Sequence, residues 1–176
     1  MKKLTFERLV QMRLTSEQAL AAPRFPVIVC APNIRSMYNV GSLFRTCDAA
    51  RVQELILCGF TPYPPRAEIA KTALGAVDTV PWRYEHDACA ALRELRSRGV
   101  KIIAVELTEE ARPYTELDAS DMPCCLVLGN ELTGIADDVL AECDEAVMIP
   151  MHGVKHSLNV SVAAGIVIFH AVSAAS

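Results

Sequence analysis

Short apolar runs alternate with amphipathic stretches along most of the chain. Five mostly apolar runs are short enough to be buried strands, and they cover residues 27–31, 55–58, 101–107, 124–128 and 146–149. Residues 79–84 predict an edge strand, because Pro81 lacks the N–H that a central strand donates to its neighbours.

Apolar residues that recur every three or four positions predict helices between these strands. The predicted helices cover residues 39–50, 69–74, 87–98, 135–143 and 157–174. Buried strands separated by helices predict an α/β fold, in which a parallel sheet is covered by helices on both faces. The expected organisation is a single domain over residues 25–176, preceded by a short N-terminal helical segment at 1–24 that packs outside the sheet.

The charge of the chain changes this picture only locally. A net charge of −4 argues against a protein that coats nucleic acid, since such proteins have a strong basic excess. It leaves room for a local basic site, and two clusters are candidates: Arg24, Arg35, Arg45 and Arg51, and later Arg93, Arg96, Arg98 and Lys101. The second cluster is typical of a solvated helix face.

The seven cysteines indicate a reducing compartment, and we expect a cytoplasmic protein. Their number is odd, no CxxC occurs, and most lie inside apolar segments. No metal site is expected, because His152 and His156 are separated by Gly153 in a predicted loop. No apolar run reaches the roughly 18 residues that span a bilayer, and the first residues do not resemble a signal peptide.

Functional sites in parallel α/β folds lie beyond the carboxyl ends of the strands, which selects the loops after residues 31, 107, 128 and 149. In the first loop, Asn39 is predicted to cap a helix, and Gly41 leaves space for a ligand. Arg45 lies four residues after Gly41 on the same helix face, so the helix start could hold a phosphate. The alternative is a capped helix in which Arg45 pairs with Asp48.

The loop after residue 128 contains Gly129, Glu131 and Gly134. The two glycines allow the backbone to fold tightly against a ligand. Glu131 at the end of a strand is placed for chemistry, but it could equally lie beside the start of the next helix. Both interpretations stay open on spacing alone.

The last loop leads into a helix that is apolar on nearly every side. Ser157 is predicted to cap this helix, and Asn159 and Ser161 are polar residues in its first turns. Such a helix must be buried, and part of its surface is expected at a subunit interface. The alternative is that Ser157 and Asn159 cap the helix and do nothing else.

Taken together and in this order, the three loops resemble the SpoU family of RNA 2′-O-methyltransferases in the knotted SPOUT superfamily. The resemblance covers roughly residues 27–172. It rests on an Asn-x-Gly-x-x-x-Arg-Thr segment, on an apolar strand followed by Gly-x-Glu-x-x-Gly, and on Ile-Pro-Met followed by Ser-Leu-Asn-Val-Ser. The matching residues are Asn39, Gly41, Arg45, Thr46, Gly129, Glu131, Gly134, Ile149, Pro150, Met151, Ser157, Leu158, Asn159, Val160 and Ser161.

The resemblance implies that the chain uses S-adenosylmethionine to methylate a ribose 2′-hydroxyl of structured RNA, with transfer RNA ahead of ribosomal RNA. It places the adenosine in a pocket formed by residues 107–109, 129–134 and 149–158. The implied cofactor contacts are Leu107, Gly129, Ile149, Met151 and Leu158, and the implied catalytic residues are Arg45, Asn39, Glu131, Ser157 and Asn159.

The family also implies a C-terminal trefoil knot and a homodimer through the knot region. In the family, the counterpart of Arg45 is the proposed catalytic residue, in some members as the base. Because a guanidinium stays protonated in proteins, we favour a role for Arg45 in binding phosphate and stabilising alkoxide charge.

Two other functions remain open at this level. One is a non-catalytic RNA- or nucleotide-binding protein on the same fold, which would lack the combination of Arg45, Glu131 and Asn159. The other is an enzyme that uses a different adenosine-containing cofactor.

Overall fold

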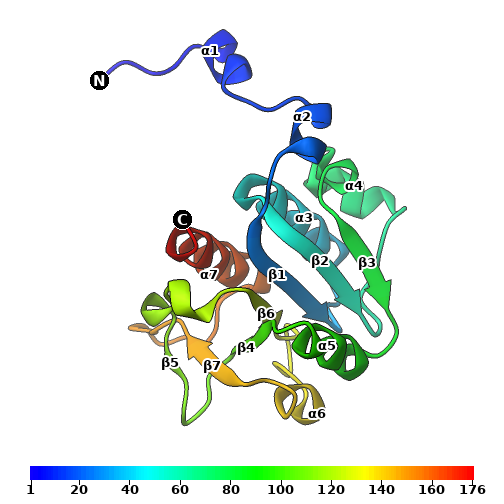
Figure 1. Ribbon diagram of the computed structural model, residues 1–176, viewed down its shortest axis with the longest axis vertical. Helices are drawn as coiled ribbons and strands as arrows, with labels where there is room; N and C mark the ends of the chain where they lie inside the picture. Colours follow the sequence, from blue (N-terminus) through cyan, green and yellow to red (C-terminus); the bar gives the residue numbers. More distant parts are fainter.

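A seven-stranded parallel sheet forms the centre of the molecule, as the computed structural model of residues 1–176 shows (Figure 1). The strands lie side by side in the order β3-β2-β1-β6-β4-β7-β5. Their bounds are Phe25–Pro32 for β1, Val52–Cys58 for β2, Trp82–Glu85 for β3, Lys101–Val105 for β4, Arg112–Pro113 for β5, Cys124–Leu128 for β6 and Glu145–Met148 for β7.

Helices cover both faces of this sheet, so the predicted α/β architecture is confirmed (Figure 1). One face packs against α3, α4 and α7, and the other packs against α5 and α6. The helices are α1 Phe6–Gln11, α2 Ser16–Ala21, α3 Met37–Ala50, α4 Ala67–Ala73, α5 Ala88–Ser97, α6 Asp137–Leu140 and α7 Val160–Ala174, with 3-10 turns η1 Ala76–Asp78, η2 Tyr114–Glu116 and η3 Ala119–Asp121.

The central strands are buried on both sides, which explains why they are apolar without alternation. In β1, Val27 and Val29 pack toward α3 and α7, whereas Ile28 and Cys30 pack toward α5. The predicted edge strand is β3, which starts directly after Pro81. The two-residue β5 was not predicted, because so short a strand has no periodicity to detect.

Two helix starts differ from the prediction. The N-cap of α3 is Ser36, whose hydroxyl accepts a hydrogen bond from the N–H of Asn39 at 3.3 Å, so Asn39 lies in the first turn. The N-cap of α7 is Asn159 rather than Ser157, and its Oδ1 accepts from the N–H of Ser161 at 2.9 Å. Both pairs contain two residues with cap propensity, and tertiary contacts of the loops select between them.

The expectation for Gly41 was wrong, because this glycine serves helix packing. A Cβ at Gly41 would overlap Thr72 and the carbonyl of Ile69, so its absence lets α3 approach α4 closely. The alternative of an ion pair between Arg45 and Asp48 is also wrong. Asp48 instead accepts a hydrogen bond from the hydroxyl of Thr79 at 2.5 Å.

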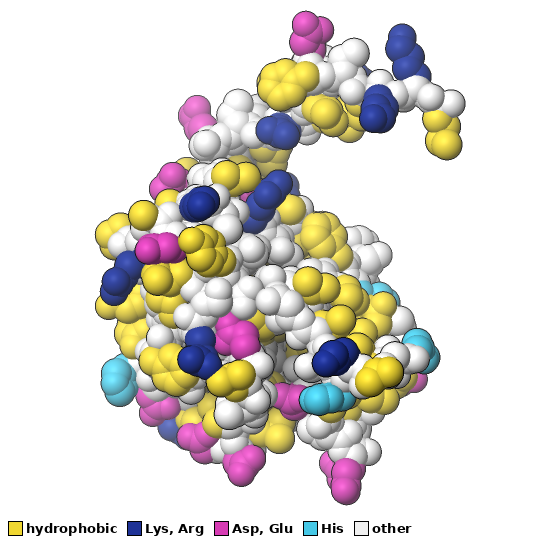
Figure 2. Space-filling view, turned by 180° about the vertical axis from the view of Figure 1, so that it is seen from behind, with side chains coloured by type: hydrophobic (Ala, Val, Ile, Leu, Met, Phe, Trp, Pro, Cys, Tyr) yellow, Lys and Arg dark blue, Asp and Glu magenta, His cyan; other side chains and the backbone are white.

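Residues 1–24 form two short helices, α1 and α2, which bury none of their residues. This segment extends away from the body of the protein (Figures 1 and 2). At its end, the guanidinium of Arg24 donates to the carbonyls of Val52 and Thr79 at 3.2 and 2.5 Å. The division into a segment at 1–24 and a domain at 25–176 stays a prediction.

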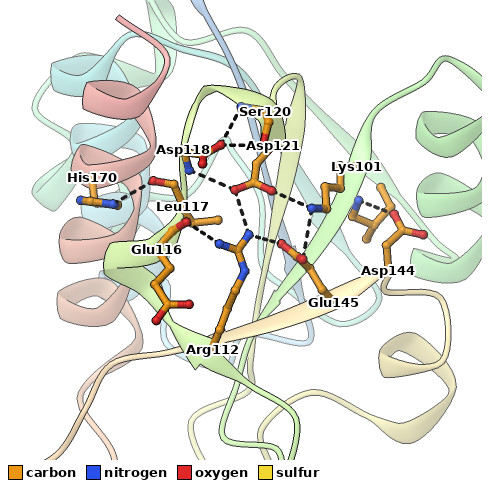
Figure 3. A network of polar contacts seen from close by, with 11 residues as sticks. Lys101, Arg112, Glu116, Leu117, Asp118, Ser120, Asp121, Asp144, Glu145 and His170 are labelled. Atoms are coloured by element: carbon orange, nitrogen blue, oxygen red, sulfur yellow. Dashed lines mark hydrogen bonds and ion pairs between the residues drawn. The ribbon is translucent and has the colours of Figure 1, made fainter.

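The amino ends of β4 and β7 are joined by a charged network around Asp121, whose side chain is 4% exposed (Figure 3). Its carboxylate accepts from Lys101 at 2.6 Å and from Arg112 at 2.8 Å, and both cations also contact Glu145. Burial raises the pKa of Asp121, but the hydrogen bonds from Arg112 and Lys101 outweigh it and lower the pKa to about 2. The network ties the connection between β4 and β6 to the sheet.

The second basic cluster of the sequence is engaged in ion pairs. Arg93 and Arg96 both contact Glu142, at 2.6 and 3.1 Å, and Arg98 contacts Glu94 at 3.0 Å. The two pairs with Glu142 join α5 to the segment after α6, and the pair with Glu94 is local to α5, so this helix face is neutralised by acidic neighbours.

Candidate active site

A cavity of about 730 Å³ lies at the carboxyl ends of β4, β6 and β7. Its walls come from three connections that are far apart in the sequence, at residues 105–108, 128–135 and 147–160. This is the edge at which parallel α/β folds place ligands, and the volume suits a small organic molecule.

Glu106 joins two walls of this cavity. One oxygen of its carboxylate accepts from the N–H of Leu107, and the other accepts from the N–H of Ile135, both at 2.9 Å. Gly134 has a positive φ of 68°, and a Cβ at this position would overlap the Glu106 carboxylate. Glu106 was not among the predicted site residues, because the predicted strand at 101–107 included it and its contact with Ile135 depends on the fold.

The turn after β6 closes on itself through backbone hydrogen bonds. Asn130 and Gly134 exchange two N–H to carbonyl bonds, at 2.9 and 3.0 Å. A Cβ at Gly129 would lie 3.0 Å from the backbone of Gly134, so the two glycines of the motif permit this close approach. The turn thereby presents its backbone to the cavity and directs Glu131 toward the start of α3.

Glu131 connects the turn after β6 to the loop after β1. Its carboxylate accepts from the N–H groups of Arg35 and Ser36 at 3.0 and 3.1 Å, and from the side-chain amide of Asn39 at 2.9 Å. Partial burial raises the pKa of Glu131, but these hydrogen bonds more than offset it, so the pKa lies below its usual value. The same bonds hold residues 35 and 36 outside the helix, which explains why α3 starts after Ser36.

Asn39 extends this contact to the third motif. Its side-chain oxygen accepts from the side-chain amide of Asn159 at 3.2 Å, so a chain of hydrogen bonds runs from Glu131 through Asn39 to Asn159. The three segments that the sequence analysis singled out therefore meet at one place, beside the cavity.

Four of the five predicted catalytic residues line the cavity or contact residues that line it, and Arg45 does not. Glu131, Ser157 and Asn159 line the cavity, and Asn39 reaches it through its two hydrogen bonds. Arg45 lies further along α3, is exposed, makes no ion pair and does not line the cavity. The predicted cofactor residues all line the cavity: Leu107, Gly129, Ile149, Met151 and Leu158.

The histidines and cysteines contribute little to this site. His152 and His156 are exposed, and only His156 lines the cavity. No group of three or more His, Cys, Asp or Glu side chains is arranged to hold a metal ion. None of the helices has the length and apolar character needed to cross a membrane.

Residues 26–169 match the SpoU rRNA Methylase family. The chain belongs to this family. The match contains the loop after β1, the turn after β6 and the loop before α7, which are the three segments that meet at the cavity.

Two relatives are similar to this chain over most of its length. The tRNA (guanosine(18)-2′-O)-methyltransferase of Thermus thermophilus is 34% identical over 94% of this chain and 84% of its own length. The 23S rRNA (guanosine-2′-O-)-methyltransferase RlmB of Ralstonia nicotianae is 35% identical over 84% of this chain and 58% of its own length.

Two solved structures have the same fold. The TrmH/SpoU tRNA modifying enzyme of A. aeolicus superposes with a TM-score of 0.79 at 31% identity, over 95% of this chain and 82% of its own. An AdoMet-bound rRNA methyltransferase from Sinorhizobium meliloti superposes with a TM-score of 0.77 at 30% identity, over 82% of this chain and 55% of its own.

Proposed function

We propose that this SpoU protein is an enzyme that transfers a methyl group from S-adenosylmethionine to the 2′-hydroxyl of a ribose in structured RNA. The observation that carries the proposal is the chain of hydrogen bonds from Glu131 through Asn39 to Asn159 at the edge of the cavity. The relatives support it, because those compared above are named as 2′-O-methyltransferases of tRNA or rRNA.

The lining of the cavity fits the cofactor. Leu107, Ile149, Met151 and Leu158 supply apolar surface for the adenine, and the turn at 129–134 supplies backbone polar groups. When bound, S-adenosylmethionine supplies a methyl group on a sulfonium, which is already a good leaving group. This chain must therefore hold the donor, align the ribose oxygen and help the hydroxyl lose its proton.

We assign to Arg45 the stabilisation of the negative charge that develops on the ribose oxygen during the reaction. It is exposed and has no carboxylate partner, so its guanidinium is free to bind a phosphate next to the target ribose and to stabilise negative charge on the oxygen. That phosphate would accept the proton. Glu131, Asn39 and Asn159 would orient the ribose, and Ser157 would contact it from the cavity wall.

Transfer RNA is the substrate class that we favour. The match to the Thermus thermophilus tRNA enzyme leaves only 11 of the 176 residues outside it, so it includes part of residues 1–24. The chain spans little more than half of the Ralstonia rRNA enzyme, 58%. The tRNA enzyme is thus similar over 94% of this chain and the rRNA enzyme over 84%, and this wider match supports transfer RNA as the substrate class.

We further propose a trefoil knot at the C-terminus, a homodimer through that region and a cytoplasmic location. The support for the knot is the resemblance of the three motifs to the SpoU family, which implies it. Val162 and Phe169 on α7 are each 50% exposed although the helix is apolar, which supports a subunit contact. The seven unpaired cysteines support a reducing compartment.

Two measurements test the enzyme. Calorimetry with S-adenosylmethionine and S-adenosylhomocysteine should show binding to the purified protein. Ribose-methylation mapping of RNA from cells with and without the gene should reveal one or a few lost 2′-O-methyl nucleotides. Cofactor binding without any lost modification would favour a non-catalytic protein instead.

A further inference from the structure

Exposed aromatic rings and exposed cations occur together on α3, on α4 and on the loops that precede these helices, and these segments are in contact with one another. We propose that this aromatic–basic surface, made of Tyr38, Phe60, Tyr63, Arg35, Arg66 and Lys71, binds the single-stranded nucleotides next to the target ribose. The inference rests on the proposed function and adds to it where the RNA lies and which side chains contact its bases and phosphates.

Tyr38 connects this surface to the candidate active site. It directly precedes Asn39, and its side chain is 49% exposed. Tyr38, Ser42 and Arg45 follow one another at helical spacings of four and three, so the ring and the guanidinium share one stripe of α3. The ammonium of Lys71 lies 5.9 Å from the centre of the Tyr38 ring, which places a cation against an accessible aromatic face.

Phe60 lies on a loop that follows β2, the strand next to β1, and its side chain is 63% exposed. The loop is fixed to the end of β1 and to the loop after it by three hydrogen bonds. The N–H of Phe60 donates to Asn33 Oδ1 at 3.2 Å, the N–H of Ile34 donates to Thr61 Oγ1 at 2.8 Å, and that hydroxyl donates to the carbonyl of Ala31 at 2.8 Å. An exposed ring on a fixed backbone loses little conformational entropy when it binds.

Tyr63 lies on the same loop and is 45% exposed. Its ring packs against that of Tyr84 with 4.4 Å between the ring centres, and the Tyr84 hydroxyl donates to the carbonyl of Gly59 at 2.6 Å. The hydrogen bond holds the Tyr84 ring in place, and the Tyr84 ring packs against that of Tyr63. The loop presents two aromatic side chains, from Phe60 and Tyr63, without covering them.

The cations of this surface are free of carboxylates. Arg35, Arg66 and Lys71 are exposed and take part in no ion pair. In contrast, every lysine and arginine between residues 83 and 112 contacts at least one acidic side chain. Arg45 is also exposed and unpaired, so four cations without a carboxylate partner lie on α3, on α4 and on the loops that precede these helices.

This combination fits RNA better than it fits a second copy of the chain. Exposed aromatic rings stack on bases irrespective of sequence, and unpaired lysine and arginine side chains bind phosphates. Two copies that met through this surface around a two-fold axis would bring the same cations together, and like charges in an interface oppose association.

Equilibrium binding of a labelled tRNA transcript tests the aromatic part. Tyr38→Ala and Phe60→Ala should each weaken binding at least about fivefold, because each removes a stacking platform. Tyr38→Phe keeps the ring and should bind within about twofold of wild type. In methyl-transfer assays the alanine variants should raise the KM for RNA while kcat at saturating RNA stays near wild type, and calorimetry should show unchanged binding of S-adenosylhomocysteine.

Salt dependence tests the basic part. Lys71→Ala should reduce the slope of log Kd against log salt concentration by about 0.7 to 0.9, the change expected for one lost phosphate contact. Arg98→Ala is the matched control, because Arg98 is exposed but paired with Glu94, and it should leave the slope unchanged.

The outcomes separate this surface from the proposed function. If the wild-type protein methylates no RNA, the proposed function fails. If it methylates RNA and folded Tyr38→Ala and Phe60→Ala variants bind RNA as wild type does, only the surface proposal is overturned. It is also overturned if light scattering shows that these variants change the oligomeric state while RNA affinity is retained, since the surface would then be a subunit contact.

Discussion

The parallel strands begin at one side of the sheet and end at the opposite side, here called the amino edge and the carboxyl edge. The two edges stabilise their carboxylates in opposite ways. At the amino ends of the strands, Asp121 is buried and is neutralised by Lys101 and Arg112. At the carboxyl ends, Glu131 is held by two backbone N–H groups and by Asn39, with no cation in contact. The first arrangement is closed and contributes stability. The second keeps a negative charge and its amide neighbours beside an open cavity, where they can orient a substrate.

The cations show the same contrast. The cations near the amino edge and on α5 form ion pairs with acidic side chains of the protein, whereas Arg45 on α3 has no acidic partner. If the comparison is correct, substitutions at the carboxyl edge change catalysis or binding with little loss of stability, and substitutions at the amino edge do the reverse.

Arg45→Ala should have the largest effect on activity. Loss of the free guanidinium should lower kcat for methyl transfer by about 1000-fold, the upper range for the loss of one group that stabilises developing charge. Binding of S-adenosylhomocysteine should stay nearly intact, because Arg45 does not line the cavity. Arg98→Ala is the control and should keep full activity; normal turnover by Arg45→Ala would remove this residue from the mechanism.

Glu131→Gln should have the next largest effect. The substitution keeps the shape but turns an N–H donor toward the N–H groups of Arg35 or Ser36, so Asn39 and Asn159 lose their fixed positions. We expect kcat to fall about 100-fold, the size expected for a small misplacement of reacting groups. The thermal midpoint should change by only a few degrees.

The pH dependence sharpens this prediction. The pKa of Glu131 is lowered, so the carboxylate is fully ionised above its ordinary pKa, and its contribution is lost only as pH falls through the lower value. Glu131 should therefore not cause any fall in methyl-transfer rate between pH 6 and pH 8, a range taken well above the ordinary value of about 4.3. A rate decline in this range that disappears in Glu131→Gln would contradict the assignment.

Gly134→Ala should affect cofactor binding more than chemistry. The positive φ of Gly134 strains any other residue, and the added Cβ would displace the Glu106 carboxylate that joins two cavity walls. About tenfold weaker binding of S-adenosylhomocysteine is expected by calorimetry, corresponding to roughly 1.4 kcal/mol. Gly153→Ala is the matched control, since no atom lies within 4 Å of a Cβ there, and it should bind normally.

Asp121→Asn should have the smallest effect on activity and a large effect on stability. Removing one partner of a buried ion network leaves Lys101 and Arg112 incompletely paired, and we expect a loss of about 3 kcal/mol in the free energy of unfolding. Denaturant titrations measure this loss. In assays of the folded Asp121→Asn protein, kcat should stay at the wild-type value. A large loss of kcat in folded Asp121→Asn would mean that the amino edge is functional.

The same carboxyl gives a pH signature in stability. Its pKa of about 2 lies below the ordinary value of 3.8, so its contribution is complete above about pH 4 and is lost as pH falls toward 2. Wild type should therefore lose stability across this window more steeply than Asp121→Asn. Parallel curves for the two proteins would show that the ion network contributes nothing measurable.

The sequence predicted most of the fold because the central strands are continuous apolar runs and their helices have clear spacing. It did not predict β5, which has only two residues, or the starts of α3 and α7. Each start has two cap-forming residues, and the choice is made by long-range hydrogen bonds such as those from Arg35 and Ser36 to Glu131. Local propensity contains no information about such contacts.

The site was predicted only as separate loops. Spacing along the chain cannot show that Asn39 contacts both Glu131 and Asn159, because these residues are 92 and 120 positions away. Gly41 was misassigned for the same reason, since its neighbour is Thr72 on another helix. The structural role of Glu106 depends on Ile135 and was likewise invisible in its own segment.

The most direct test of the central claim is methyl transfer from labelled S-adenosylmethionine to tRNA transcripts, followed by digestion and nucleoside analysis. The account predicts that wild-type protein forms a 2′-O-methyl nucleoside, that Arg45→Ala forms almost none, and that a transcript with a 2′-deoxy nucleotide at the target position is not modified. Label on a base, or undiminished product from Arg45→Ala, would contradict it.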